Sequence, residues 1–172
     1  MNIGMKTAML LAGTAAMAAC AKKAPEELPP PPPSTTSTPA PTPSATPTGP
    51  RVGSQAHFEN AVNGQNVIYF DTDRFNIDSE DSARLQTQAQ YLARYPQVSI
   101  TIEGHADERG TREYNLALGE RRANAAKNFL VSLGVDAGRI AMVSYGKERP
   151  VALGSNEESW ARNRRAVSLA VN

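Results

Sequence analysis

The sequence predicts an α/β fold, an α+β sandwich in which helices pack against a single β-sheet. Segments with the period of a strand alternate with segments with the period of a helix, in the order β-α-β-α-β-β, over the C-terminal two thirds of the chain. Elements that alternate in this way pack as helices on a sheet. The residues before them are rich in proline and poor in apolar side chains, so only residues 57–172 are expected to form a packed domain.

The first predicted strand covers residues 66–70, Asn-Val-Ile-Tyr-Phe, because β-branched and aromatic residues favour a pleated strand. A helix is predicted between Ser79 and Tyr95, where apolar residues recur at helical spacing. Pro96 ends this helix, since proline lacks the backbone N–H that a helix needs. The residues at helical spacing are Ala83, Leu85, Ala89, Leu92 and Ala93.

The next strand is predicted over residues 98–103, where apolar and polar side chains alternate strictly. That alternation is the period of a half-buried strand. A second helix is predicted from Arg112 to Leu133, and Gly134 ends it. The predicted buried stripe of this helix consists of Leu116, Gly119, Ala123, Ala126, Leu130 and Leu133.

Two further strands are predicted over residues 139–145 and 165–171. The connection between them contains Pro150, Gly154 and a short helical piece over residues 157–162. The pattern leaves the order of the strands in the sheet open, and the chain shows no convincing internal repeat.

The only cysteine of the chain, Cys20, ends a short apolar run at the N-terminus. Lys6, the apolar residues 7–19 and the small side chains before Cys20 have the layout of an export signal. The apolar run is too short for a helix that crosses ~30 Å of hydrocarbon. The run Met17-Ala-Ala-Cys20 resembles a bacterial lipobox, which implies that residues 1–19 are removed and that Cys20 carries lipid. The alternative is an ordinary cleaved signal that leaves a free thiol.

Residues 20–56 are predicted to form a semi-extended tether. Eleven of the 13 prolines lie between Pro25 and Pro50, among Ser, Thr and Ala. Proline cannot donate a backbone hydrogen bond to a helix or sheet, and this segment has few apolar side chains to bury. At the ~3.1 Å per residue of a polyproline helix the tether would span on the order of 100 Å.

The charge of the chain is close to balanced, with 18 Lys and Arg residues against 17 Asp and Glu residues. A nucleic-acid-binding domain would need a basic face, so this class of protein is excluded. With a single cysteine the domain has no disulfide, and packing alone must hold it together.

The most informative segment covers residues 103–124. Asp107 follows a predicted strand end, and a glycine three residues later allows a tight turn into the next helix. On that helix Asn115, Leu118 and Arg122 are spaced i, i+3 and i+7, so they share one face. An acid and an arginine can therefore flank one shallow groove. Such a pair suits a zwitterion, because the acid accepts from an ammonium while the guanidinium donates two parallel hydrogen bonds to a carboxylate.

These residues resemble the OmpA-like peptidoglycan-binding domain family. The matching residues begin with the run Glu103-Gly-His-Ala-Asp107, followed by Asn115, Leu118 and Arg122-Ala. The resemblance covers residues 60–172 and is strongest to the lipid-anchored members of the family in Gram-negative bacteria. It implies an OmpA-like fold with helices packed on one mixed sheet. Longer matching runs are 107–111, 113–115, 118–124, 143–148 and 163–167.

The resemblance implies a non-catalytic clamp, without a cofactor, on the peptide stem of peptidoglycan. The ligand unit is meso-diaminopimelate, whose free end carries one ammonium and one carboxylate. By motif position Asp107 and Arg122 are the principal contacts, and Asn115 supports the loop or donates to the ligand. Whether Asp71 or Asp73 faces the groove stays open. The further groove positions are Phe70, Asp71, Ala106, Arg109 and Leu118.

The resemblance also implies an outer-membrane lipoprotein that faces the periplasm and acts with the Tol system in envelope integrity and cell division. A TolB-like periplasmic protein would bind an overlapping surface, so that the cell wall and this partner compete. Ala21 lacks the acidic side chain that favours retention in the inner membrane.

Two other classes of function stay open. One is a scaffold for periplasmic proteins that does not bind the wall. The other is an enzyme of wall metabolism, which would need zinc ligands, a nucleophile with its base, or a carboxylic acid of raised pKa in a deep cleft. The chain has two histidines and no thiol within the predicted domain, so the enzyme has little support.

Structural interpretations also exist for the same residues. Asp107 and Arg122 could pair with each other, although a surface ion pair contributes only ~0–1 kcal/mol. With Arg122 assigned to the ligand, we expect Arg122→Ala to abolish wall binding without unfolding the domain. His105 is interpreted as structural, and Trp160 as a residue that fills the core.

A metal site has little support from the sequence. The run Asp71-Thr-Asp73 begins like a calcium-binding loop, but Phe75 and Asn76 stand where such a loop needs an oxygen ligand and a glycine. His57 and His105 are the only histidines, and neither belongs to a paired zinc motif. We therefore expect no metal.

Overall fold

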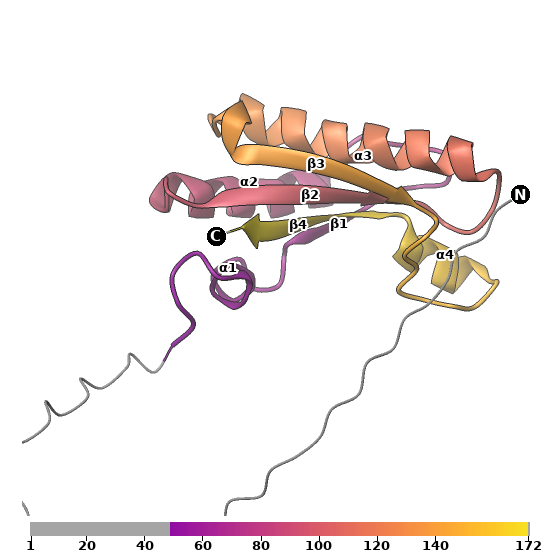
Figure 1. The fold of residues 1–172 in the computed structure, drawn as a ribbon, viewed down its shortest axis with the longest axis horizontal. Coiled ribbons are helices and arrows are strands. Elements are labelled where there is room, and N and C mark those ends of the chain that lie inside the picture. Colours follow the sequence, from indigo (N-terminus) through magenta and orange to yellow (C-terminus); the bar gives the residue numbers. More distant parts are fainter. Residues whose placement is uncertain (1–48, 172) are drawn as a thin grey trace, which may run out of the picture. The chain divides into compact units, whose positions relative to one another are not determined.

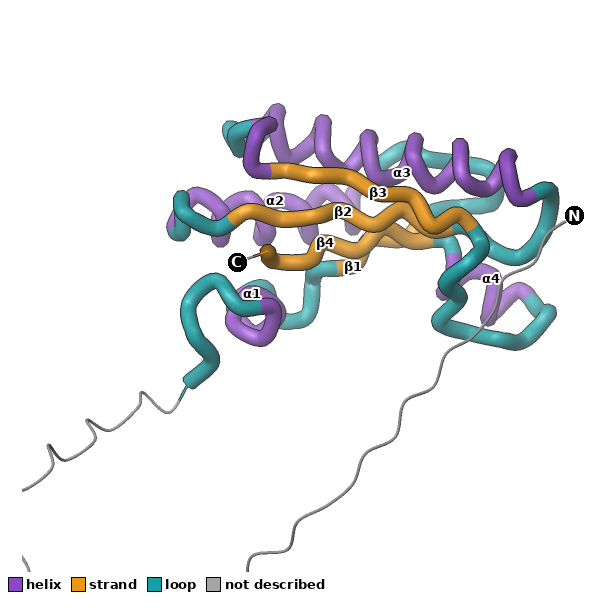
Figure 2. The backbone as a smooth tube through the Cα atoms, in the orientation of Figure 1, coloured by secondary structure: helices purple, strands orange, loops and turns teal. Residues whose placement is uncertain are grey.

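The computed structural model describes residues 49–171, which form one sheet with helices packed on it (Figures 1 and 2). The predicted α/β fold is confirmed. The elements are α1 (Gln55–Ala61), β1 (Val67–Tyr69), α2 (Ser79–Arg94), β2 (Ser99–His105), α3 (Arg112–Ser132), the 3-10 helix η1 (Ala137–Arg139), β3 (Ile140–Gly146), α4 (Glu157–Asn163) and β4 (Arg165–Val171).

The sheet is mixed, and its strands lie in the order β1-β4-β2-β3. Strand β4 is antiparallel to both β1 and β2, whereas β2 and β3 are parallel. The C-terminal ends of β1, β2 and β3 therefore lie at the same end of the sheet as the start of β4. The segments that leave these strands meet there, and they build the site described below.

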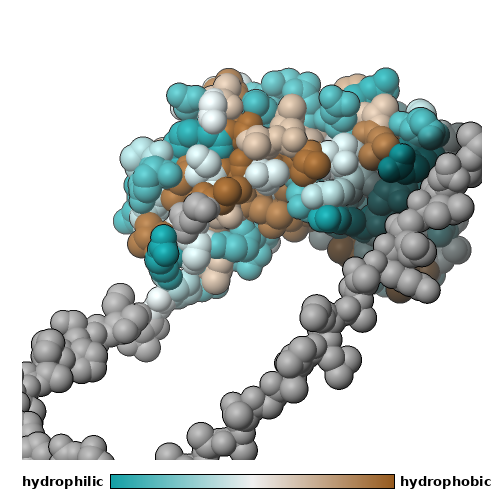
Figure 3. Space-filling model, viewed as in Figure 1, coloured by the Kyte–Doolittle hydropathy of each residue, from teal (hydrophilic) through white to brown (hydrophobic). Residues whose placement is uncertain are grey.

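The hydrophobic core lies between the sheet and the helices α2 and α3, which run together along one face of the sheet (Figures 1 and 2). The other face is partly open, and Figure 3 shows apolar side chains across the middle of it. Half-buried residues of this open face include Val143, Val167 and Leu169. The core includes Phe58, Ile68, Leu85, Leu92, Ile100, Ile102, Ala123, Ala126 and Leu130.

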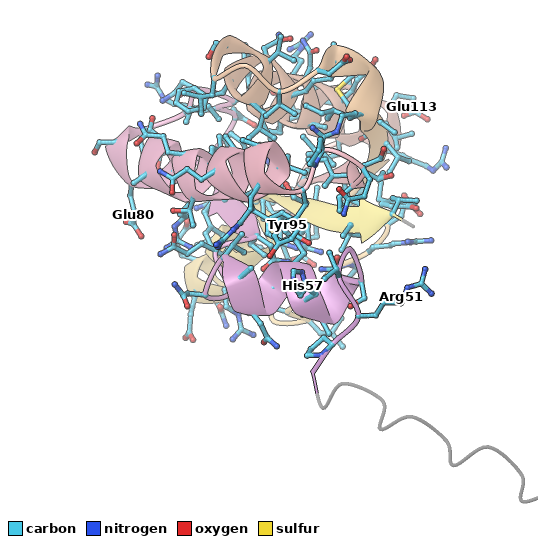
Figure 4. The ribbon with its side chains drawn as sticks, turned by 90° about the vertical axis from the view of Figure 1, so that its left-hand side faces the viewer. Arg51, His57, Glu80, Tyr95 and Glu113 are labelled. Carbon is cyan, nitrogen blue, oxygen red and sulfur yellow. The ribbon has the colours of Figure 1, made fainter. Side chains whose placement is uncertain are left out.

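Helix α1 packs beside α2 at the end of the sheet where β4 finishes. Figure 4 shows His57 of α1 facing Tyr95 at the end of α2, and their ring centroids lie 5.1 Å apart. The backbone N–H of Ala170 donates to Oε1 of Gln55 at 2.7 Å. Strand β1 is short and pairs only with the first residues of β4, so this part of β4 has a neighbouring strand, β2, on one side only, and α1 covers the other side.

Helix α2 also covers the outer edge of β1. Three of its side chains, spaced i, i+3 and i+7, share the face that lies along this edge strand. An uncovered edge strand would present unpaired backbone groups to other chains. The bonds run from the N–H of Tyr69 to Oδ2 of Asp81 at 3.2 Å, from Arg84 to the carbonyl of Val67 at 3.3 Å, and from Gln88 to the carbonyl of Gln65 at 2.6 Å.

Helix α3 crosses β2 at two glycines, Gly104 and Gly119. A Cβ on Gly104 would collide with the backbone carbonyl of Gly119, and a Cβ on Gly119 would collide with Oγ of Ser144. The two backbones can approach this closely only because both residues lack a side chain. The close crossing brings the N-terminal half of α3 down to the end of β2.

Two predictions about the packing are wrong. The buried stripe of α3 does not include Leu133, which is 42% exposed, and Leu116 is only half-buried. The stripe includes Asn115, Leu118 and Arg122 instead, because α3 ends at Ser132 and its N-terminal half turns this face to the loops. Trp160 is only half-buried and lies outside the core cluster, since α4 packs over the loops at the end of the sheet.

Helix α1 was not predicted from the sequence. This helix begins at Gln55, inside the segment interpreted as tether, and Ser54 caps it by accepting from the N–H of His57. Seven residues are too few to show a helical period, and within the helix only Phe58 is buried. Its stability comes from the core contact rather than from its own sequence.

The predictions for residues 1–48, including the signal, Cys20 and most of the tether, lie outside the described residues. Among the helices of residues 49–171, none has the length and apolar character needed to cross a membrane.

Candidate ligand-binding site

The loop that follows β2 is fixed by a glycine turn and by three hydrogen bonds that the side chains of Thr111 and Asn115 make. Gly110 has φ of 84°, the left-handed conformation that glycine adopts without strain. Thr111 caps α3 by accepting from the N–H of Tyr114. The side-chain amide of Asn115 donates to the carbonyls of Arg109 at 2.7 Å and Thr111 at 3.1 Å. Asn115 therefore supports the loop with both of its amide hydrogens.

Asp107 is nearly buried in this loop, and two arginines neutralise it. Arg109 donates from Nη2 to Oδ2 at 2.6 Å and from Nε to Oδ1 at 3.1 Å, and Nη1 of Arg164 lies 3.5 Å from Oδ2. Burial would raise the pKa of Asp107, but the hydrogen bonds and charges of Arg109 and Arg164 outweigh it and hold the pKa below its usual value. Asp107 is therefore ionised at neutral pH.

Arg109 is itself held in place by the ring of Trp160. Its guanidinium lies 4.2 Å from the ring centroid of Trp160, and the indole N–H of Trp160 donates to Glu108 at 3.0 Å. Stacking on an aromatic face suits the planar guanidinium. Trp160 thus supports the arginine that holds Asp107.

Arg122 is completely buried and holds three backbone carbonyls together. It donates to Arg74 at 2.9 Å, to His105 at 2.8 Å and to Asp71 at 3.0 Å. Burial, together with the charge of Arg164, lowers the pKa of Arg122 to about 10, so the side chain stays charged at neutral pH. A guanidinium has five N–H groups. Three of them serve these carbonyls, which leaves one on each terminal nitrogen for another acceptor.

A cavity of about 240 Å³ connects these groups. It contains two carboxylates, Asp73 and Asp107, and two guanidiniums, Arg109 and Arg122, so its charge is balanced. Leu118 supplies apolar surface. The complete lining is Thr72, Asp73, Asp107, Arg109, Gly110, Tyr114, Asn115, Leu118 and Arg122.

Comparison of the chain with known proteins identifies its family. The model of the OmpA family matches residues 69–164. The peptidoglycan-associated lipoprotein of Agrobacterium fabrum is 55% identical over 126 residues, which cover 73% of this chain and 67% of that protein. The chain belongs to the OmpA family.

Other relatives agree with this assignment. The peptidoglycan-associated lipoprotein of Rhizobium meliloti is 56% identical over 117 residues, 68% of this chain and 65% of that protein. The crystal structure of the peptidoglycan-associated lipoprotein from Burkholderia pseudomallei superposes with a TM-score of 0.63 at 48% identity, covering 66% of this chain and 96% of that one. The C-terminal domain of Helicobacter pylori MotB has the same fold, with a TM-score of 0.58 at 20% identity over 62% of this chain and 84% of that one.

The OmpA-family domain brings together five of the eight residues predicted to contact a ligand. Asp107, Arg109, Asn115, Leu118 and Arg122 all line the cavity. Three others lie elsewhere. Phe70 and Asp71 line a neighbouring cavity of about 290 Å³, and Ala106 is buried.

Phe70 and Asp71 nevertheless contact Arg122, one of the residues that line the first cavity. The ring centroid of Phe70 lies 5.2 Å from the guanidinium carbon of Arg122, and the carbonyl of Asp71 accepts from Arg122. The question left open between Asp71 and Asp73 has a structural answer, because Asp73 lines the cavity and Asp71 does not.

Asp107 and Arg122 do not pair with each other. Within residues 49–171 the ion-pair partners of Asp107 are Arg109 and Arg164, and the partners of Arg122 are carbonyl groups. The interpretation of the two residues as a simple structural pair is therefore wrong.

Three further lining residues were not predicted from the sequence, namely Thr72, Gly110 and Tyr114. Tyr114 precedes Leu118 by four residues and shares its helix face, so the helical spacing could have identified it. Its hydroxyl donates to Oδ1 of Asp73 at 3.3 Å. No local pattern points to Thr72.

His105, which was interpreted as structural, is buried. It is 1% exposed, and burial with the charges of Arg165 and Arg149 lowers its pKa to about 3, so the ring is neutral. Arg164 pairs with Asp107 and with Glu157, the latter at 2.7 Å. Over the part of the chain that the structure describes, no three His, Cys, Asp or Glu side chains are grouped to hold a metal ion.

Proposed function

We propose that this protein is a lipid-anchored tether that binds peptidoglycan without catalysis. Lipid on Cys20 would hold the N-terminus in the outer membrane, and the OmpA-family domain would grip the cell wall from the periplasmic side. The named relatives, which are peptidoglycan-associated lipoproteins, support this assignment.

The observation that carries the proposal is the balanced charge of the cavity. A free end of meso-diaminopimelate carries one ammonium and one carboxylate. Asp107 accepts from the ammonium, since its two carboxylate oxygens offer about four acceptor sites and Arg109 occupies three. The two remaining N–H groups of Arg122 lie on separate nitrogens, which suits a carboxylate that accepts two parallel hydrogen bonds.

The cavity is better suited to binding than to chemistry. A general acid for bond cleavage would need a raised pKa, whereas the pKa of Asp107 is lowered. Both arginines are fixed by partners inside the domain, Arg109 by Asp107 and Trp160, and Arg122 by three carbonyls. Such a preorganised site loses little conformational entropy when a ligand binds.

The finer parts of the proposal rest on the family resemblance. The lipoprotein would act in the Tol-Pal system in envelope integrity and cell division, and a TolB-like periplasmic protein would compete with the wall for an overlapping surface. Exchange between the two partners would then relocate the lipoprotein to division sites.

The test is sedimentation of the purified protein with purified peptidoglycan, in the presence and absence of free meso-diaminopimelate. We expect the wild-type protein to pellet with the wall and the free amino acid to release it. Asp107→Asn should bind more weakly by roughly tenfold or more, because the ammonium loses its counter-charge.

The matched control is Asp136→Asn, which changes the same side chain at the exposed cap of η1. Asn caps a helix as well as Asp does, so this variant should bind like the wild type. Equal binding by Asp107→Asn and the wild type would exclude Asp107 as a contact. Wild-type protein that stays in the supernatant would contradict wall binding altogether and would favour the scaffold.

A further inference from the structure

A second groove lies on the other side of the loop that follows β1. Its cavity of about 330 Å³ runs between this loop and the outer face of α3. Arg121, Asn124 and Asn128 line it from the helix, and their spacing of i, i+3 and i+7 places them on one face. Phe75 and Asn76 line it from the loop.

The groove combines an aromatic ring with several amide groups. Phe75 is 46% exposed, although a large apolar side chain is usually better buried. Asn76, Asn124 and Asn128 are exposed, and each amide can both donate and accept hydrogen bonds. Among the residues that line this groove the only charged side chain is that of Arg121, which donates without accepting.

This combination matches the chemistry of a sugar ring. A pyranose presents an apolar face of C–H groups, which can cover an aromatic ring, and a rim of hydroxyl groups that both donate and accept. An N-acetyl group adds one amide of its own. A peptide carboxylate or an ammonium would fit less well, because the groove has no acidic side chain and only one cation.

The position of Phe75 is fixed by the first site. Arg122 donates to the carbonyl of Arg74, the residue before Phe75, and to the carbonyl of Asp71. Asp73 between them has φ of 57°, so the chain turns sharply at this point. The turn directs Asp73 to the first cavity while Phe75 lines the second.

The two sites also share α3. Leu118 belongs to the first cavity and Asn124 and Asn128 to the second, so they are six and ten residues apart. At 1.5 Å per residue this separation is roughly 9–15 Å along the helix. An extended peptide of about three to four residues spans the same distance. Peptidoglycan joins its peptide stems covalently to a glycan strand, so one wall fragment can reach both sites.

We propose that the groove between Phe75 and the Asn124–Asn128 face of α3 binds the N-acetylated amino sugars of the glycan strand while the first cavity holds the stem peptide. This inference rests on the proposed function, because it assigns a second part of the same polymer to the domain. Phe75 covers the apolar face of a sugar ring, and the amides bind its hydroxyl and N-acetyl groups.

Titration calorimetry with three defined probes tests the inference. The probes are a tetrapeptide stem that contains meso-diaminopimelate, the same tetrapeptide attached to its disaccharide, and N-acetylchitotetraose, which has no peptide. We expect the wild-type protein to bind the disaccharide-peptide roughly tenfold more tightly than the tetrapeptide, which corresponds to about 1.4 kcal/mol. Phe75→Ala and the double variant Asn124→Ala/Asn128→Ala should lose this gain and keep the affinity for the tetrapeptide.

The control variant is Val131→Ala, which removes a 37% exposed apolar side chain of α3 outside the groove. It should keep the gain from the disaccharide. Equal affinities of the wild-type protein for tetrapeptide and disaccharide-peptide would overturn the glycan site while leaving the peptide site intact.

Failure of the proposed function gives a different result. If neither peptide probe binds, the peptide clamp is wrong, and N-acetylchitotetraose then decides the groove separately. Binding of this glycan that Phe75→Ala abolishes would support the groove, and absence of glycan binding would overturn it.

Discussion

Arg122 is a charged residue without solvent contact, and its neighbours explain how the domain tolerates it. The guanidinium replaces water with three carbonyl oxygens, two from the loop that follows β1 and one from the end of β2. An unpaired buried charge would cost far more than these bonds return. The residue that we assign to the ligand carboxylate is thus also a structural residue, which changes what its removal should do.

We expect Arg122→Ala to lower the free energy of unfolding by about 3–5 kcal/mol, because three carbonyls lose their donor and a cavity remains. Urea denaturation followed by circular dichroism measures this. The adjacent, exposed Arg121→Ala is the control and should change stability by less than about 0.5 kcal/mol. An Arg122→Ala domain as stable as the wild type would return Arg122 to a purely ligand-binding role, as the sequence alone suggested.

Asp81 is another buried ionisable residue, and its burial makes the stability of the domain depend on pH. Burial raises its pKa from 3.8 to about 6, although the N–H of Tyr69 acts in the opposite direction. The folded state therefore binds the proton more tightly than the unfolded state. The contribution of Asp81 to stability is complete below about pH 3.8 and is lost as the pH rises through about 6.

Asp81→Asn should remove this loss. We expect the variant to gain about 2–3 kcal/mol relative to the wild type between pH 4 and pH 7, from a shift of about two pKa units. Denaturation of both proteins over this pH range gives the difference. The lowered pKa of His105 imposes the opposite slope on both proteins and cancels in the subtraction. A difference that does not vary with pH would contradict the raised pKa, and Glu120→Gln, at an exposed position of α3, serves as control.

Residue roles that depend on sequence spacing could be predicted, and roles that depend on distant backbone could not. Leu118 and Arg122 were assigned to one face from their spacing, and both line the cavity. The partners of Arg122 are carbonyls 48, 17 and 51 residues away in the chain, and a carbonyl carries no residue-type signal. Its complete burial was therefore invisible in the sequence.

At the scale of elements, the crossing of α3 over β2 positions the site. The two backbones meet at Gly104 and Gly119, and the helix continues from there to the loop that contains Asp107. A wider separation would move Leu118 and Arg122 away from the end of β2. Both glycines are thus as important to the cavity as the residues that line it.

Gly104→Ala should destabilise the domain by several kcal/mol, because the new Cβ collides with the rigid backbone of α3 rather than with a movable side chain. The melting temperature should fall accordingly. Gly49→Ala is the control, since a Cβ there has no neighbour within 4 Å. Similar melting temperatures for wild type and Gly104→Ala would mean that α3 can shift without loss of packing.

Long periodic elements were predictable, and α1 and the topology were not. The segments from Ser79 to Arg94 and from Arg112 to Ser132 differ from their predicted ranges by one residue at the C-terminal end. The strand order depends on which strands pair, and a sequence pattern with period two does not encode the partner. Helix α1 is stabilised by contacts with α2 and β4 that no local pattern shows.

At the scale of the whole molecule, the proposal requires an anchor at one end of the chain and a binding domain at the other. The domain is charged on its surface and holds its own core. Under this proposal, membrane attachment comes from lipid on Cys20 in the N-terminal segment. Several acyl chains give firm attachment, whereas one chain binds only marginally.

Cys20→Ser should therefore release the protein from the membrane fraction and prevent incorporation of labelled palmitate, while the released protein still pellets with purified peptidoglycan. Fractionation of cells that express each variant measures this. Thr14→Ser, a change within the same apolar run, is the control and should stay with the membrane. Membrane attachment of Cys20→Ser that equals the wild type would rule out lipid on this residue.

Helix α1 and the ligand cavity lie at opposite ends of the strands, since Gln55 bonds to Ala170 at the end of β4 while Arg164 contacts Asp107 just before its start. A pull between membrane and wall would therefore run lengthwise along the sheet. Under such a shear force the hydrogen bonds that join β4 to β2 carry the load together, whereas a force across the strands would peel them apart one by one. If the protein tethers the membrane to the wall as proposed, this arrangement would resist tension in the direction in which a swelling cell envelope would apply it.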